Sequence, residues 1–146
     1  MFLLYGILAV ALVADFRHFR IPNVLILVGI MAGIGYTAWS DGLWYLALLE
    51  GLILLLVLYP FYMIGAFGGG DVKLLAVVGI FLGLEMGVNV AVLSLMTGDV
   101  CSVFKILYEL FRKKWLSFKH LYIHFSLPIF IGTILVQFGG ITWITF

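Results

Sequence analysis

The chain of 146 residues is poor in charge: Asp, Glu, Lys and Arg make up 10% of it, against about 25% in an ordinary soluble domain. This scarcity excludes a disordered tail and a soluble enzyme, and it leaves no basic surface on which nucleic acid would bind. The single cysteine, Cys101, excludes an intramolecular disulfide and a CxxC metal site. Hydrophobic residues make up 65% of the chain and aromatic residues 16%. The composition therefore predicts an all-α membrane protein, with residues 1–146 forming a single domain.

Apolar segments separated by turns indicate the number of membrane spans. A helix needs about 20 residues to cross roughly 30 Å of hydrocarbon. A turn is expected at Ser40-Asp41-Gly42, and residues 65–70 are too rich in glycine to be helical. Hydropathy allows two arrangements of residues 74–104, either one long helix or two spans bent near Glu85. The expected spans are residues 2–14, 21–39, 43–64, 72–84, 86–111 and 121–144.

The placement of the basic residues favours six spans with both termini extracytoplasmic. In that arrangement every Lys and Arg lies at or near a cytoplasmic end, as the positive-inside rule requires. Five spans would translocate the basic cluster of residues 112–119. The first apolar segment is a retained span rather than a signal peptide, because its basic residues follow it. The eight basic residues are Arg17, Arg20, Lys73, Lys105, Arg112, Lys113, Lys114 and Lys119.

Glycines spaced four apart predict close approach between helices, since each set lines one helix face. No internal repeat is visible, so the inverted-repeat design of many transporters finds no support. The two sets are Gly29 and Gly33, and Gly79, Gly83 and Gly87.

Two carboxylates fall at the same membrane surface. Asp15 closes the first span and Asp71 opens the fourth, and the two whole spans between them return the chain to the cytoplasmic side. Each acid also has a local explanation: Asp71 could be an N-cap, and Asp15 could pair with Arg17 or Arg20. However, Asp15 stands at a helix carboxyl end, where the helix dipole disfavours negative charge. An acid at this position does not stabilise the helix, so Asp15 is a functional candidate.

Residues 65–70 place flexible, glycine-rich backbone directly before Asp71. Such backbone near a bilayer is tolerated when it is buried in protein or lines a watery cavity. It lacks the P-loop spacing, and its glycines would let another backbone approach closely. Two acids beside such a loop suit aspartyl proteolysis, in which one carboxylate activates water and its protonated partner donates a proton. From the helix ends, we expect Asp71 to be the ionised base and Asp15 the proton donor.

These motifs resemble those of the type IV prepilin peptidase family. The segment Asp15-Phe16-Arg17-His18-Phe19-Arg20-Ile21-Pro22-Asn23 is similar to that family's first catalytic segment, which ends in IPN. The segment Gly68-Gly69-Gly70-Asp71-Val72-Lys73-Leu74 is similar to its GxGDxKL segment, whose GxGD core presenilin-type proteases share. The segment Ser126-Leu127-Pro128-Ile129-Phe130-Ile131-Gly132 is a looser match to the last span of the family.

The resemblance implies cleavage of a short basic leader from prepilins or pseudopilins, just before the hydrophobic pilin helix. It implies that the active site faces the cytoplasm of a prokaryotic plasma membrane, with Asp15 and Asp71 as the catalytic pair. Gly68, Gly69, Gly70 and Lys73 are the expected substrate contacts, and Lys73 either orients Asp71 or binds lipid headgroups. Because no cysteine-bearing cytoplasmic domain is seen, the chain looks like the short form associated with tight-adherence (Flp-type) pili. We therefore expect no N-methylation, no cofactor and no metal.

Two other functions stay open. Glu50 and Asp99 lie within expected spans and could carry protons or cations in a small coupled transporter, although each could also be a neutral acid bonded between helices. A pilus or secretion scaffold without turnover is the third possibility. The three histidines show no metal-ligand spacing. The oligomeric state and the particular pilin are not predicted.

Overall fold

The computed structural model describes residues 2–18, 21–40, 42–65, 67–111 and 126–140, with the backbone alone for residues 18 and 99–111. Within these ranges the chain is helical and contains no strand. The all-α expectation is confirmed. The described helices are α1 (Phe2–His18), α2 (Asn23–Ser40), α3 (Trp44–Met63), α4 (Gly69–Leu82), α5 (Leu84–Phe111) and α6 (Ser126–Gly139).

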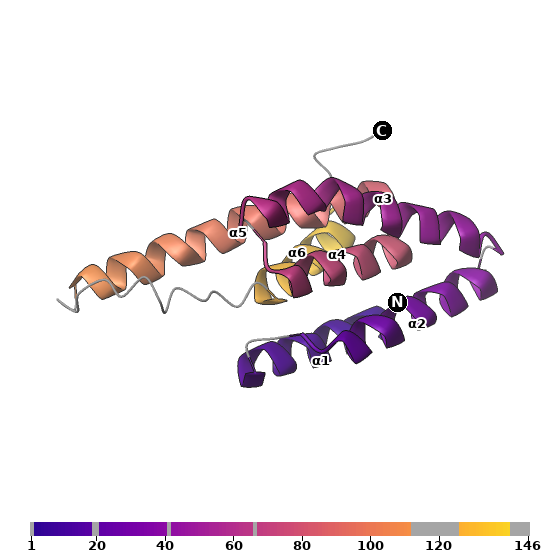
Figure 1. Ribbon diagram of the computed structural model, residues 1–146, viewed down its shortest axis with the longest axis horizontal. Helices are drawn as coiled ribbons and strands as arrows, with labels where there is room; N and C mark the ends of the chain where they lie inside the picture. Colours follow the sequence, from indigo (N-terminus) through magenta and orange to yellow (C-terminus); the bar gives the residue numbers. More distant parts are fainter. Residues whose placement is uncertain (1, 19–20, 41, 66, 112–125, 141–146) are drawn as a thin grey trace.

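Successive helices run in opposite directions (Figure 1). As a result, the carboxyl end of α1 and the amino ends of α2, α4 and α6 lie at one end of the bundle, which we name the site end. Asp15, in the last turn of α1, and Asp71, in the first turn of α4, therefore share this end. The two helices between α1 and α4 return the chain to the same end, as the sequence predicts.

The short helix α4 is the centre of the bundle and packs against α2, α3, α5 and α6 (Figure 1). Val72 and every residue from 74 to 81 are buried. Glycines allow this packing: a Cβ added at Gly29 would stand 2.9 Å from Val77 Cγ1, and one at Gly79 would stand 2.9 Å from Leu54 Cδ2. The predicted close approach at these glycines is confirmed.

Gly83 corrects one part of that prediction. It was expected to share a helix face with its neighbours at four-residue spacing, but it separates α4 from α5 and adopts φ 89° and ψ 166°. This region of backbone space is essentially restricted to glycine. The chain reverses there, so residues 74–104 form parts of two antiparallel helices rather than one.

The outer surface of the bundle is strongly apolar. Among the described residues, α2 and α3 are long and apolar enough to cross a membrane, and only 22% of each such window is buried inside the molecule. By contrast α4, with 14 residues, extends only about 21 Å. The fold is that of a membrane protein, whereas the six-span count and the sidedness of the termini stay predictions.

Candidate active site

Asp15 is held in a buried polar contact between α1 and α6. Its side chain is 9% exposed, and Ser126, at 1% exposed, donates a hydrogen bond from Oγ to Asp15 Oδ2 at 2.6 Å. Nearer the opposite ends of the same two helices, the Tyr5 hydroxyl donates to Oε1 of Gln137. These two contacts fix α6 against α1, and the first gives the Asp15 carboxylate a short, buried donor.

Asp71 occupies the third position of α4, after the N-cap residue Gly68. The backbone nitrogens of Asp71 and Val72 donate to the carbonyl of Gly68, at 3.1 and 3.2 Å. The Asp71 side chain folds back over the same residue, since a Cβ added at Gly68 would stand 2.6 Å from Asp71 Oδ2. Asp71 is therefore not the N-cap that the local explanation required, and it lies ahead of the apolar part of α4.

The two carboxyl groups are close enough to interact electrostatically. Burial of the Asp71 carboxyl and the charge of Asp15 raise the pKa of Asp71 to about 7, although a backbone hydrogen bond from Gly68 opposes this shift. Both effects favour the protonated form of the Asp71 carboxyl group, and Asp15 accepts a hydrogen bond from Ser126. This raised pKa is opposite to the shift that the sequence-based assignment expects for Asp71 as the ionised base, and which carboxyl group carries the proton stays a prediction.

The three glycines before Asp71 serve packing within the chain. A Cβ added at Gly69 would lie 3.3 Å from the ring of Tyr62 in α3, and one at Gly70 would lie 3.2 Å from Cβ of Ile21. Gly69 and Gly70 are also helical, so the expectation that residues 65–70 are wholly non-helical is wrong. Contact between these glycines and a substrate stays a prediction.

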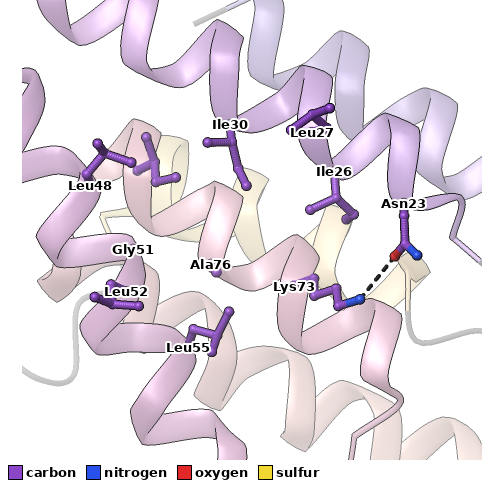
Figure 2. A pocket seen from close by; sticks show the side chains of 11 residues that line it. Asn23, Ile26, Leu27, Ile30, Leu48, Gly51, Leu52, Leu55, Lys73 and Ala76 are labelled. Carbon is purple, nitrogen blue, oxygen red and sulfur yellow. Dashed lines mark hydrogen bonds between the residues drawn. The ribbon is translucent and has the colours of Figure 1, made fainter.

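The described hydrogen bond of Lys73 is directed away from Asp71, and the role of Lys73 in orienting that acid stays a prediction. Two residues along a helix correspond to a rotation of about 200°, which directs the two side chains to different faces of α4. The Nζ atom of Lys73 donates to Oδ1 of Asn23, the first residue of α2, at 3.0 Å (Figure 2). This bond joins the two sequence motifs, but it does so outside the carboxylate pair.

No described contact joins Glu50 and Asp99, the two acids that a coupled transporter would use. Glu50 is half-buried on α3, and its carboxylate lies beside the α4–α5 break, 3.6 Å from the position of a Cβ at Gly83. The side chain of Asp99 lies outside the described residues. Among described side chains, no three His, Cys, Asp or Glu residues gather into a group that could hold a metal ion.

The sequence matches a known protein family. The model of the type IV leader peptidase family matches residues 2–103. The chain belongs to this family. No curated protein and no solved structure matches it.

The match to the type IV leader peptidase family covers both motifs that carry the carboxylates, and it implies a peptidase. Ser126 lies beyond the matched residues, in the segment that is a looser match to the last span of the family, and no role is predicted for it from the sequence. The only sequence signal for it was its position at the start of an apolar segment near a Pro–Gly pair. Its contact with Asp15 is the part of the site that depends on tertiary structure.

Proposed function

We propose that this leader peptidase is an aspartic endopeptidase that removes the basic leader from a prepilin or pseudopilin. The observation that carries the proposal is the pair of carboxyl groups at the site end, one hydrogen-bonded by Ser126 and the other with its pKa raised to about 7. Membership of the leader peptidase family supports the substrate class. The chain's own side chains supply both the acid and the base, so the reaction needs no cofactor.

In the proposed reaction, Asp15 takes a proton from a water molecule as the water oxygen attacks the scissile carbonyl carbon. Asp71 gives its proton to the carbonyl oxygen, and a neutral gem-diol forms. As the C–N bond breaks, Asp15 returns its proton to the leaving nitrogen and one diol hydroxyl reprotonates Asp71. The cycle ends with Asp15 ionised and Asp71 protonated, as at its start.

The arrangement of charge supports a cytoplasmic active site. Arg17 and Lys73 are exposed at the site end, and the positive-inside rule assigns basic helix ends to the cytoplasm. A substrate would then bring its leader from the cytoplasm and its apolar helix from the bilayer, with the scissile junction at the interface. We further propose that cleavage is not followed by N-methylation of the new terminus.

The test is a cleavage assay with the purified protein and a candidate prepilin, with products identified by mass spectrometry. Asp15→Asn and Asp71→Asn should each abolish cleavage, while helical content and melting temperature stay close to those of the parent. Glu50→Gln is the matched control, because it also neutralises a half-buried carboxylate. Full processing by either aspartate variant, or loss of processing only in Glu50→Gln, would refute the proposal and favour the transporter interpretation.

A further inference from the structure

A cavity of about 410 Å³ lies on the face of α4 opposite to the carboxylate pair, and we name it the lateral groove (Figure 2). Its floor is α4, its walls are α2 and α3, and its lining residues fall within 23–30, 48–55 and 73–80. On the walls, Leu27 is 59% exposed and Leu52 is 53% exposed. The groove therefore opens sideways, toward the surface of the bundle that faces lipid.

The lateral groove is polar at one end only. Asn23 and Lys73 meet in their hydrogen bond at the site end, and the other lining residues are aliphatic or glycine. Both polar side chains are exposed, so the ammonium of Lys73 can bind an anion while keeping its bond to Asn23. A cation at one end of an aliphatic channel complements an anionic amphiphile whose headgroup lies at the site end.

The length of the groove fits one leaflet. Each of the three lining segments rises by seven residues from its first to its last lining residue, which corresponds to about 10.5 Å of helix. Half of the hydrocarbon core is roughly 15 Å thick. A bound chain would thus follow about two-thirds of a single leaflet, whereas a spanning substrate helix would need contacts across both leaflets.

We propose that the lateral groove is a binding site for an anionic glycerophospholipid of the leaflet at the site end. Its phosphate contacts Lys73 beside Asn23, and one acyl chain lies along the α4 floor over Ala76. Lys73 and Ala76 lie on a different face of α4 from Asp71, so the site does not include the carboxylate pair.

The test uses native mass spectrometry of the full-length protein incubated with phosphatidylglycerol and phosphatidylcholine of identical acyl chains. The parent should retain phosphatidylglycerol about fivefold more than phosphatidylcholine, as expected for one basic side chain near the membrane surface. Lys73→Gln should abolish this preference and Lys73→Arg should keep it. Arg17→Gln, the matched control, removes a charge at the same end outside the groove and should also keep it.

Two further measurements test the acyl chain. Ala76→Leu, which fills the floor, should lower the retention of both lipids. In the unaltered protein, phosphatidylglycerol with a photoreactive acyl chain should label residues 23–30 or 48–55, which keeps the test valid if Ala76→Leu fails to fold. Equal retention of both lipids by the parent, an equal loss in Arg17→Gln and Lys73→Gln, or labelling confined to other segments would overturn the proposal.

Discussion

Leader cleavage by this protein should stop as the pH rises through neutrality. In the proposed mechanism Asp71 is the proton donor, and only its protonated form is active. With a pKa of about 7, Asp71 is about 90% protonated at pH 6, half protonated at pH 7 and about 10% protonated at pH 8. The value of kcat/KM should therefore fall about tenfold between pH 6 and pH 8.

The assay is a pH series of initial cleavage rates with the purified protein and one prepilin, with helical content measured at each pH. The carboxylic acid band of Asp71 in the infrared spectrum gives an independent readout. That band should fade with the same midpoint as the activity and be missing in Asp71→Asn. A kcat/KM that is constant or rising from pH 6 to pH 8, in protein that stays folded, would refute the assignment of Asp71 as the acid.

A substitution of Asp15 tests how far its charge raises the pKa of Asp71. Asp15→Asn removes the negative charge that helps to raise the pKa of Asp71, so the Asp71 band should disappear at a lower pH than in the parent. A midpoint unchanged by this substitution would mean that burial alone sets the pKa, and that the two carboxyl groups do not form a coupled pair.

Three substitutions test the geometry of the site and of the fold. Ser126→Ala removes a buried hydrogen bond to the Asp15 carboxylate, so it should destabilise the protein by about 1–3 kcal/mol in denaturant titrations and slow cleavage, with Ser126→Thr restoring both. In Gly68→Ala the added Cβ would displace the Asp71 carboxylate, so kcat should fall about tenfold or more with little change in melting temperature. An unchanged kcat would show that this position of the carboxylate is unimportant for cleavage. Gly83→Ala forces alanine into a glycine-only conformation and should cost about 1–3 kcal/mol in the same titrations. Gly35→Ala, with no atom near its added Cβ, is the control and should be neutral or mildly stabilising.

The raised pKa of Asp71 shows how the effect of a helix end can be outweighed. A helix amino end favours a negative charge on Asp71, but this effect is worth only about 0.3–1 kcal/mol at an exposed position. Burial and the neighbouring charge of Asp15 disfavour the ionised form of Asp71. These two effects outweigh the effect of the helix end. The sequence gives the position of Asp71 in its helix, but it does not give the distance to another carboxylate or the depth of burial.

Lys73 illustrates the same limit for a motif residue. Its proximity to Asp71 in sequence suggested a role in orienting that acid, but helical geometry separates their side chains. The hydrogen bond to Asn23 connects two motifs that are 50 residues apart. A shared motif therefore does not imply a shared contact, because neighbouring residues of a helix face different partners.

The sequence by itself determined the helical class, the placement of most helix boundaries and the placement of Asp15 and Asp71 at one end of the bundle. The length of an apolar segment and the glycines that interrupt it are local properties of the sequence. An even number of crossings between two residues returns the chain to the same side. Only the tertiary structure decided that Ser126 bonds to Asp15, that the pKa of Asp71 is raised, that Gly83 ends a helix and that Lys73 faces a groove. These features depend on the rotation of each helix about its axis and on the contacts of residues far apart in sequence, which packing fixes and local pattern does not.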